Sequence, residues 1–484
     1  MTALDFDRGP QSLRFGDAVF RVFYLPVCDS TNLRLRLWAQ GTPPEGLEGP
    51  LEAGDCLVAG EQTLGRGRLG RSFLSPCGGL YFSLCLKAAD ARQALEMTPA
   101  AACAVCAALE EMGIASPGIK WVNDLYVRGR KVCGILCERV GDRVICGIGI
   151  NLADPPGGFP PEAGMAGSLM RPDLKREDVL ARVLEKIAFF TDAKNAGATL
   201  SAYRQRQVLT GKGVRCEVGK QVIQGRVLGI GPDYSLEVAT EEGWTRRVSS
   251  GEVTRVRPEG EDGGEIALRA AFFDFDGTLR PGDSIVSFLA FAVKKGKLSR
   301  GALARAGIDA ALGKLGLMPL DQVKTRALSF ERALSQPERD ALCAAFVEER
   351  LLKEIRPRGL EKWLRLREEG YRMVLVTAST GDYMAPLARA LGADALLCTP
   401  VDDSGRVGPN CRGKEKARRM LAWAGGLPAG FRVDWENSLA FGDSAGDESL
   451  LSLTGRPAAV DPDGKLRRTA LKRGWALLEW KKQT

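Results

Sequence analysis

The sequence predicts an α/β multidomain protein: a mixed α+β module, then a small β-barrel, then a doubly wound parallel sheet with a helical insertion. Strand-like runs form a meander in the first part of the chain, and short alternating runs fill residues 213–256. Beyond residue 265, apolar strands alternate with helical segments, which is typical of a parallel sheet with crossover helices. The length of 484 residues suits about two to four domains. We expect domains at 1–208, 209–257 and 266–484, with a linker at 258–265.

The first module is expected to be a mixed sheet with helices. Strands are predicted at 55–61 and 79–87, before a helix rich in Ala and Leu at 97–112. Three further strand-like runs are separated by Arg-Gly-Arg and Gly-Asp-Arg turns, and they lie at 119–127, 131–140 and 144–152. An amphipathic helix follows at 176–190, and the alternating runs of 213–256 then suit a small β-barrel.

The last domain should open with a buried strand at 266–275. Residues 283–360 are helical by pattern and form the insertion after that strand. Strands then return at 371–377, 395–399 and 438–442, with a helix starting near 414. The linker before this domain is rich in Gly, Glu and Asp, which predicts a tether with few contacts between the two halves.

Composition removes several classes of function. With 45% hydrophobic and 26% charged residues, the chain should be a globular protein of the cytoplasm. It has no apolar run of about 18 residues, so we expect no transmembrane segment. Asp5 and Asp7 stand where a signal peptide would be basic and then apolar. The net charge of +8 is modest and no DNA-reading motif accompanies it, so we expect no nucleic-acid partner.

The histidine and cysteine content narrows the chemistry further. The chain has no histidine, which excludes Ser-His and Cys-His mechanisms and histidine zinc sites. Its 13 cysteines lie mostly in apolar runs, and we expect them to be reduced and buried. Cys103 and Cys106 form a lone CxxC in an alanine-rich helix, where core packing is the favoured interpretation. Catalysis must therefore use lysines, arginines, carboxylates, backbone amides and a hard cation such as Mg²⁺.

A candidate phosphate-binding loop occupies residues 65–71. Glycines allow backbone amides to approach a phosphate and arginines bind it through two N–H groups, and the loop alternates them as Gly65, Arg66, Gly67, Arg68 and Arg71. A flexible basic surface loop is the alternative for this motif alone. The neighbouring meander favours function, because it carries Lys120, Asn123, Asp124 and Lys131 around one hairpin.

These motifs resemble the biotin protein ligase family over about residues 20–257. The matching pieces, in order, are Asp-Ser-Thr-Asn (29–32), Glu-Gln-Thr-Leu-Gly-Arg-Gly-Arg (61–68), Lys-Trp-Val-Asn-Asp (120–124), Arg-Lys-Val-Cys-Gly-Ile-Leu-Cys-Glu (130–138) and Gly-Ile-Gly-Ile-Asn (147–151). Val122 and Phe73 depart from the residues usual in the family, proline and tryptophan, and we expect them to alter loop fit only. The lipoate ligases are a weaker match, because their motif includes a histidine.

The resemblance implies biotin and ATP as ligands and a biotin carboxyl carrier protein domain as partner. Ser30, Thr31 and Gln62 would bind the ureido end of biotin, and the 65–71 loop would close over biotinyl-adenylate. Lys131 would contact the α-phosphate, and Asp124 is the group available to orient or deprotonate the acceptor lysine. Other positions implied for biotin or ATP binding are Asn32, Lys120, Asn123, Gly134 and Asn151. The resemblance also implies that the predicted small β-barrel is SH3-like.

A second set of motifs places carboxylates at the ends of two predicted strands. Asp274 and Asp276 follow the first strand of the last domain, and Asp443 and Asp447 follow the run ending at 442. The carboxyl edge of a parallel sheet is where such folds bind ligands. An isolated Asp-x-Asp-Gly-Thr could be a turn, but four motif elements in order favour a catalytic site.

This set resembles the haloacid dehalogenase superfamily in its phosphoserine-phosphatase-like branch, with a Rossmann-like sheet over residues 268–480. The resemblance implies that Asp274 is the nucleophile and Asp276 the general acid and base. Thr377 and Ala378 would bind phosphate together with Lys416, for which Lys414 is a competing assignment. Mg²⁺ would be held by the aspartates, with Asp276 contributing its carbonyl, and 283–360 would be the cap. The resemblance implies a small-molecule or lipid phosphomonoester as substrate.

The leading hypothesis from the sequence is a bifunctional enzyme that biotinylates a carrier lysine and hydrolyses a phosphomonoester. One alternative is a biotin ligase with a degenerate or regulatory phosphatase-like domain. Another is a biotin-sensing transcriptional regulator, which the absence of a DNA-binding module before residue 27 disfavours.

Overall fold

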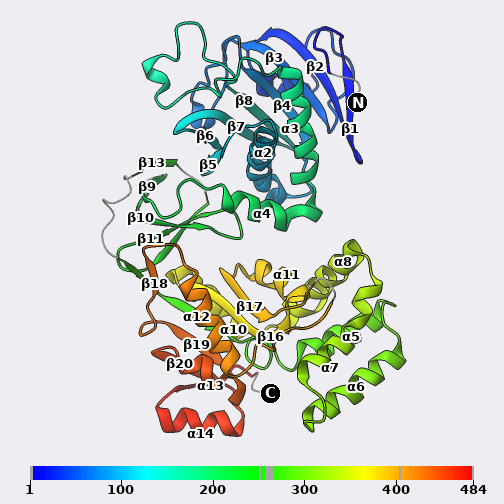
Figure 1. Cartoon of the computed structure of the whole chain (residues 1–484), viewed down its shortest axis with the longest axis vertical. Helices are drawn as coiled ribbons and strands as arrows, with labels where there is room; N and C mark the ends of the chain where they lie inside the picture. Colours follow the sequence, from blue (N-terminus) through cyan, green and yellow to red (C-terminus); the bar gives the residue numbers. More distant parts are fainter. Residues whose placement is uncertain (1–3, 220, 250–251, 257–264, 403–404, 482–484) are drawn as a thin grey trace. The chain divides into compact units, whose positions relative to one another are not determined.

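The computed structural model describes residues 4–219, 221–249, 252–256, 265–402 and 405–481. It divides into two compact units, Met1–Thr210 and Gly211–Thr484 (Figure 1). The predicted linker, 258–265, lies outside the described residues except for Glu265.

The first unit is built on an eight-stranded sheet in the order β1-β2-β3-β4-β8-β7-β6-β5. Neighbouring strands are antiparallel except β2 and β3. The strands are β1 (Gln11–Phe15), β2 (Ala18–Cys28), β3 (Asp55–Gln62), β4 (Leu80–Lys87), β5 (Gly118–Lys120), β6 (Asp124–Val127), β7 (Arg130–Val140) and β8 (Arg143–Ile150). The predicted strand at 119–127 is thus two short strands, β5 and β6, which pair through Lys120 and Asp124.

Four helices flank this sheet: α1 (Thr31–Ala39), α2 (Ala91–Glu111), α3 (Arg176–Phe190) and α4 (Ala196–Gln205). Helix α2 starts earlier than predicted because the Asp90 side chain caps it by accepting from the Gln93 N–H. Cys103 and Cys106 are buried in α2, which confirms the core interpretation of this CxxC. Helices α2 and α3 pack together (Figure 1), and α3 has the predicted bounds. On the other face, Leu35 and Trp38 of α1 join a separate apolar cluster.

The second unit begins with a five-stranded antiparallel sheet in the order β12-β11-β10-β9-β13. Its strands are β9 (Gly213–Val218), β10 (Gln221–Ile230), β11 (Leu236–Ala239), β12 (Thr245–Val248) and β13 (Glu252–Val256). The alternating sequence runs are therefore strands, as predicted. An SH3-like closure of this sheet stays a prediction.

A six-stranded parallel sheet follows, in the order β17-β16-β15-β19-β20-β21. The strands are β15 (Ala270–Phe273), β16 (Arg372–Thr380), β17 (Ala395–Thr399), β19 (Leu439–Gly442), β20 (Arg456–Val460) and β21 (Ala476–Leu478). The predicted single strand at 266–275 is divided, because β14 (Ile266–Leu268) pairs instead with β18 (Phe431–Val433) in a separate two-stranded sheet. Sequence reasoning missed β18, β20 and β21.

The alternating side chains of β15 show that this sheet is covered on both faces. Ala271 and Phe273 join one apolar cluster, and Ala270 and Phe272 join another. The first cluster includes side chains of α10 (Pro357–Glu369) and α11 (Gly381–Leu391). The second includes side chains of α12 (Lys414–Gly425), α13 (Glu448–Leu451) and α14 (Gly464–Arg473). The predicted doubly wound arrangement is confirmed.

The insertion after β15 is helical, as predicted. Its helices are α5 (Ser284–Lys294), α6 (Arg300–Lys314), α7 (Leu320–Ala327), α8 (Gln336–Phe346) and the short α9 (Leu352–Glu354), after a π-helical turn at Val347–Leu351. Helices α5, α6 and α7 form a lobe beside the sheet (Figure 1). Phe288 of α5 and Phe346 of α8 both contact Tyr383 of α11, which anchors the lobe to the core. Within the described ranges, every helix is too short or too polar to cross a membrane.

Charged side chains join the small antiparallel sheet to the parallel sheet. Arg247 on β12 contacts both carboxylate oxygens of Asp394 at 2.5 and 2.6 Å, and Glu237 on β11 pairs with Arg372 on β16. The Arg269 guanidinium also lies 4.1 Å from the ring centroid of Trp244. The expectation of few contacts across the linker is therefore wrong for residues 213–248. The amino-acid composition of a linker does not predict which contacts the segments on either side of it make.

Candidate active sites

The first candidate site begins at the N-terminus of α1, where the predicted biotin-binding residues form a buried hydrogen-bond network. The Ser30 side chain caps α1 by accepting from the Leu33 N–H at 3.4 Å. Gln62, at the end of β3, accepts from the Thr31 N–H at 2.8 Å through Oε1 and donates to Ser75 Oγ at 2.8 Å. Ser30 and Thr31 are 1% and 3% exposed. Their orientation is thus fixed by the fold.

Asn32 extends this network to β7. Its Nδ2 donates to the Leu136 carbonyl at 3.2 Å and to Glu138 Oε2 at 3.0 Å, and its Oδ1 lies 2.6 Å from Ser83 Oγ. A Cβ on Gly147 would lie 2.0 Å from Asn32 Oδ1, so only glycine leaves room for this side chain. Sequence reasoning missed Ser75, Ser83 and Glu138, because each is an ordinary strand or loop residue without its partners.

The 65–71 loop lies against the adjoining sheet. Arg68 Nη1 donates to Asn123 Oδ1 at 3.3 Å, and Asn123 Nδ2 donates to the Ile135 carbonyl at 2.9 Å. Backbone bonds close the loop on itself, from the Gly67 N–H to the Arg71 carbonyl and from the Phe73 N–H to the Gly65 carbonyl. Arg66 and Arg71 are exposed. The loop therefore places one arginine on the sheet and leaves others at its surface.

Phe73 packs on a floor made by two glycines. A Cβ on Gly134 or Gly149 would lie 2.9 Å or 2.4 Å from the Phe73 ring. Gly134 and Gly149 are paired across β7 and β8, so the ring covers one spot of the sheet. The glycines are thus required by close packing at the base of the loop.

The predicted reacting residues meet beside this loop. Lys131 Nζ lies 2.8 Å from Asp124 Oδ1, with side-chain exposures of 30% and 23%. Lys120 is the cross-strand partner of Asp124. Asn151 follows β8, and its Nδ2 donates to the Gly167 carbonyl at 2.9 Å. A partly exposed lysine–carboxylate pair beside a basic loop can bind phosphate and hold or accept a proton.

The second candidate site lies at the carboxyl edge of the parallel sheet. Asp274 follows β15, and Lys416 of α12 reaches it with an Nζ to Oδ1 distance of 2.5 Å. The same ammonium lies 2.6 Å from Asp447 Oδ1. Lys416 is 2% exposed, whereas Lys414 is exposed. The geometry therefore favours Lys416 over Lys414.

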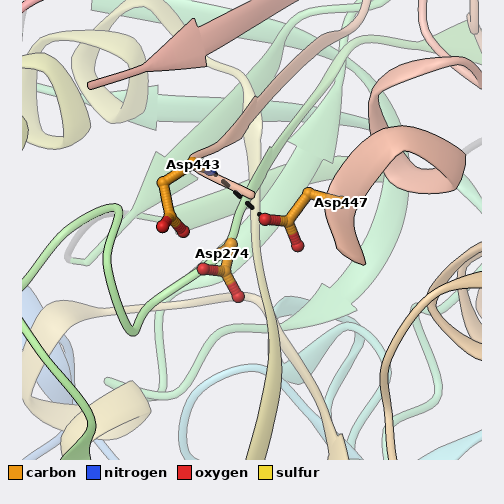
Figure 2. Close-up of side chains that lie close together, drawn as sticks. All are labelled: Asp274, Asp443 and Asp447. Carbon is orange, nitrogen blue, oxygen red and sulfur yellow. Dashed lines mark hydrogen bonds between the residues drawn. The ribbon is translucent and has the colours of Figure 1, made fainter. Parts of the chain in front are cut away.

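Asp443 completes a cluster of three carboxylates (Figure 2). One carboxylate oxygen from each of Asp274, Asp443 and Asp447 lies within 4.8 Å of the others. Asp447 Oδ2 accepts from the Asp443 N–H at 3.2 Å, and Thr278 Oγ1 lies 3.1 Å from Asp274 Oδ2. Hard divalent cations bind such all-oxygen sets. The residues present therefore fit Mg²⁺.

Burial and mutual repulsion shape the titration of this cluster. Burial, with the charge of Asp447, raises the pKa of Asp443 to about 6. Burial likewise raises the pKa of Asp274, and Asp447 and Asp443 add to the rise, although Lys416 opposes it. Burial would lower the pKa of Lys416, but the charges of Asp274 and Asp447 outweigh it and raise that pKa. A bound cation would therefore stabilise the ionised form of these carboxylates.

The side chain of Asp276 does not belong to the carboxylate cluster, and the contribution of its carbonyl to the metal site stays a prediction. Its Oδ1 accepts from the Ser284 N–H at 2.8 Å, and its Oδ2 accepts from Ser284 Oγ at 2.7 Å and Ser379 Oγ at 2.6 Å. These donors turn the carboxyl toward the insertion. Burial raises the pKa of Asp276, which favours the protonated form that a general acid needs.

The predicted phosphate-binding residues lie where β16 ends. Pairing of β16 with β17 is irregular between Val376 and Thr380, and such a bulge re-aims the side chains at a strand end. Thr377 is buried, and its Oγ1 accepts from the Ser379 N–H at 3.1 Å. Ser379 and Ser284 were missed in the sequence, because only the folded chain brings them to Asp276.

A cavity of about 510 Å³ opens beside Asp276 and Asp443. Gly277, Asp283, Arg356, Asp461 and Lys481 also line it. Its size is adequate for a small phosphomonoester.

Comparisons with known proteins match the two sites separately. The family model described as "Biotin/lipoate A/B protein ligase family" matches residues 45–152, and the "haloacid dehalogenase-like hydrolase" model matches residues 271–452. Protein CicA of Caulobacter vibrioides is 35% identical over 214 residues, which cover 40% of this chain and 86% of the relative. The bifunctional ligase/repressor BirA of Bacillus subtilis is 30% identical over 237 residues, which cover 46% and 70%.

Among solved structures, the biotin protein ligase of Aquifex aeolicus in complex with biotin and ATP is 31% identical. The match covers 49% of this chain and 98% of that chain, with a TM-score of 0.41.

Asp124 and Lys131 of the first site lie within the match at 45–152, which Ser30, Thr31 and Asn32 precede. Asp274 and Lys416 of the second site lie within the match at 271–452. The chain belongs to both families, and joins a ligase domain of the biotin/lipoate A/B protein ligase family to a haloacid dehalogenase-like hydrolase domain.

Proposed function

We propose that the protein is a bifunctional enzyme that biotinylates a lysine of a biotin carboxyl carrier protein domain and hydrolyses a phosphomonoester. The observation that carries the hydrolase is Lys416 bound between Asp274 and Asp447 in a buried carboxylate cluster. The observation that supports the ligase is the Lys131–Asp124 pair beside the 65–71 loop, together with the family match. The domain assignment 1–208, 209–257 and 266–484 is part of this proposal.

In the ligase reaction, the carboxylate of biotin attacks the α-phosphorus of ATP and pyrophosphate leaves. Negative charge grows on the α-phosphate oxygens, and Lys131 and Arg68 stabilise it as fixed cations. The network of Ser30, Thr31 and Gln62 binds the ureido group, because it offers both donors and acceptors at fixed positions. Lys120, Asn123 and the loop arginines complete the nucleotide site.

The acceptor lysine then attacks the carbonyl of the mixed anhydride, and AMP leaves. Its amine must lose a proton, and Asp124 accepts it or orients the amine. Lys131 has three N–H donors, so it can keep its contact with Asp124 while it contacts the phosphate.

The ligase is tested with the full chain, biotin, Mg-ATP and an isolated carrier domain. We expect biotin on one carrier lysine and biotin-dependent release of pyrophosphate. Lys131→Ala should slow adenylate formation about 100-fold or more, as loss of a positioned stabilising charge does. Lys87→Ala, an exposed position on the same sheet, is the matched control and should retain the wild-type rate. A folded wild-type protein that labels no carrier contradicts the ligase.

In the hydrolase reaction, a carboxylate oxygen of Asp274 attacks phosphorus and forms an aspartyl-phosphate. Lys416 and Thr377 neutralise and hold the transferring group, with the backbone at Ala378. The P–O bond to the leaving group breaks, and Asp276 gives its proton to the departing alkoxide. Water then attacks the aspartyl-phosphate, Asp276 takes its proton, and inorganic phosphate leaves.

Mg²⁺ held by Asp274, Asp443 and the carbonyl of Asp276 would neutralise charge on the phosphoryl oxygens when bound. Asp447 already accepts from Lys416, the Asp443 N–H and Ser444. It therefore holds Lys416 and the Asp443 backbone in place, and it would add a third carboxylate to the cation site. The insertion at 283–360 would act as the cap that selects the substrate.

The hydrolase is tested with a panel of phosphorylated metabolites, phospholipid monoesters and p-nitrophenyl phosphate, with and without Mg²⁺. Asp274→Asn should abolish turnover, because an amide does not attack phosphorus. Asp434→Asn, a half-buried aspartate in the turn before β19 whose carboxylate accepts from Asn437, is the control. Residual Asp274→Asn activity near wild type would show that another group is the nucleophile. A degenerate, regulatory domain would hydrolyse none of these esters. The charged residues that the chemistry needs are all present in the chain, which argues against such a domain.

A further inference from the structure

A half-buried lysine of the insertion contacts the end of β16, beside the predicted phosphate-binding residue Thr377. Lys324, on α7, donates from Nζ to the Ala378 carbonyl at 2.6 Å and to Asn410 Oδ1 at 2.7 Å. Burial lowers the pKa of Lys324 to about 8. The oxygens that accept from Lys324 are neutral rather than carboxylates, and the nearby charges of Asp283 and Asp276 offset the desolvation of the ammonium only in part. This environment indicates that Lys324 has a specific role in addition to packing.

The carbonyl that Lys324 contacts belongs to the peptide group that joins Ala378 to Ser379. A peptide group is planar, so fixing its carbonyl also fixes its N–H. The carbonyl accepts from Lys324 and from Thr399 Oγ1, and the N–H of the same group donates to Thr377 Oγ1. The orientation of this peptide therefore decides where the hydroxyls of Thr377 and Ser379 lie.

Ser379 passes this constraint to the acid–base carboxyl. Its Oγ donates to Asp276 Oδ2 at 2.6 Å, and Ser284 supplies the other two hydrogen bonds to that carboxyl. Ser284 is the first residue of α5, so it also belongs to the insertion. The insertion thus reaches Asp276 by two routes, directly through Ser284 and indirectly through Lys324 and the Ala378–Ser379 peptide.

We propose that Lys324 is a positioning residue of the hydrolase. By fixing the Ala378–Ser379 peptide, it holds Ser379 against Asp276, so that seating of the insertion also sets the geometry of the general acid. This inference rests on the proposed hydrolase function and adds a residue outside the carboxylate cluster. It has a specific consequence: loss of Lys324 harms protonation of the leaving group more than attack by Asp274.

Two esters separate these effects. The p-nitrophenolate ion leaves without a proton, whereas an alkoxide needs one from Asp276. The parameter kcat/KM covers only the steps up to cleavage of the ester bond, so the shared hydrolysis of the aspartyl-phosphate does not mask the difference. The assay compares kcat/KM for p-nitrophenyl phosphate and for ethyl phosphate in the full chain with Mg²⁺.

For Lys324→Met, kcat/KM for ethyl phosphate should fall about 10- to 100-fold, the range expected when a catalytic acid is displaced. The value for p-nitrophenyl phosphate should stay within about threefold. Lys324→Arg should recover most of the loss, because a guanidinium can donate to the same carbonyl. Ser379→Ala should show the same selectivity. Lys297→Met, on the same insertion but exposed and paired with Glu338, should change neither ester.

Several results would overturn the inference. Equal losses for both esters with a lowered unfolding midpoint would mean that Lys324 only keeps the insertion in place. Unchanged kinetics, or a Ser379→Ala variant without leaving-group selectivity, would also refute it. A wild-type protein that hydrolyses neither ester, or an Asp274→Asn variant that still does, contradicts the proposed hydrolase itself. That outcome is distinct from a failure of the positioning role alone.

Discussion

Replacing Asp394 by asparagine tests how firmly the β9–β13 sheet is attached to the parallel sheet. The side chain of Asp394 is fully buried and accepts from Arg247 and from the Met373 N–H. The charges of Arg372 and Arg247 outweigh burial and lower the pKa of Asp394 to about 2. In the Asn variant, these two guanidinium groups remain buried with Glu237 as their carboxylate partner.

The expected cost follows from the desolvation of the charges left behind. Removing one partner of a buried ion pair destabilises proteins by about 3–5 kcal/mol, whereas an exposed pair contributes about 0–1 kcal/mol. For a unit of this size, that corresponds to a lowering of the unfolding midpoint of very roughly 5–15 °C. Glu369→Gln removes the exposed pair with Arg365 and is the matched control.

The assay combines thermal unfolding with hydrogen exchange followed by mass spectrometry. Amides of β11 and β12 should lose protection together with those of β16 in Asp394→Asn, because the broken contacts join these strands. Glu369→Gln should leave both the midpoint and the exchange pattern near wild type. If Asp394→Asn behaves like the control, or if β16 keeps its protection while β11 and β12 lose theirs, the two sheets do not form one cooperative unit.

Two further predictions concern the hydrolase unit. Gly277→Ala should reduce kcat for p-nitrophenyl phosphate about 100-fold, because the new Cβ would lie 2.2 Å from Asp443 Oδ2. Gly282 also has a positive φ but open space around its Cβ, so Gly282→Ala is the control, and equal losses in the two variants would contradict the clash. Burial, with the charge of Asp382, raises the pKa of Glu331 from 4.5 to about 8. The folded protein therefore holds a proton that the unfolded chain releases, and stability from this group falls as pH rises from about 4.5 to 8. Glu331→Gln should accordingly stabilise the unit by at most about a few kcal/mol at pH 8, and by less at pH 5. Urea unfolding of both proteins at the two pH values measures this. A stability difference between variant and wild type that does not change with pH would contradict the prediction.

The sequence predicted the elements whose patterns are local. Helix α3 and strand β17 have the predicted bounds, and the alternating clusters on either side of β15 confirm the parallel, doubly wound sheet. The predicted site residues also meet: Lys131 contacts Asp124, and Lys416 contacts Asp274. Motif spacing was sufficient here because Asp124 and Lys131 lie on the paired strands β6 and β7. Asp274 and Asp443 likewise follow the adjacent strands β15 and β19.

What the sequence did not predict depends on contacts between distant segments. The division of 266–275 into β14 and β15 arises because β14 pairs with β18, far along the chain. The direction of the Asp276 carboxyl depends on Ser284 and Ser379, which carry no motif of their own. The pairing of Glu237 with Arg372 joins residues 135 positions apart. No local sequence pattern predicts these partners.

The ion pairs between the β9–β13 sheet and the parallel sheet bear on whether the two activities are independent. Asp274→Asn changes a group that contacts Lys416 and Thr278 and leaves the ion pairs of Arg247 and Arg372 in place. We therefore expect it to leave carrier biotinylation within about twofold of wild type. Asp394→Asn breaks those ion pairs and loosens the β9–β13 sheet, which the proposed domain assignment gives to the ligase.

The comparison of the two variants separates chemical from structural coupling. If residues 209–257 contribute to the ligase reaction, Asp394→Asn should slow carrier labelling more than Asp274→Asn, and the gap should widen with temperature as the sheet opens. Adenylate formation and transfer to the carrier are measured separately on the same preparations. Equal ligase rates in both variants, with the sheet demonstrably loosened by hydrogen exchange, would remove the β9–β13 sheet from the ligase reaction. A tenfold loss in Asp274→Asn with the fold intact would instead make the hydrolase site a regulator of the ligase.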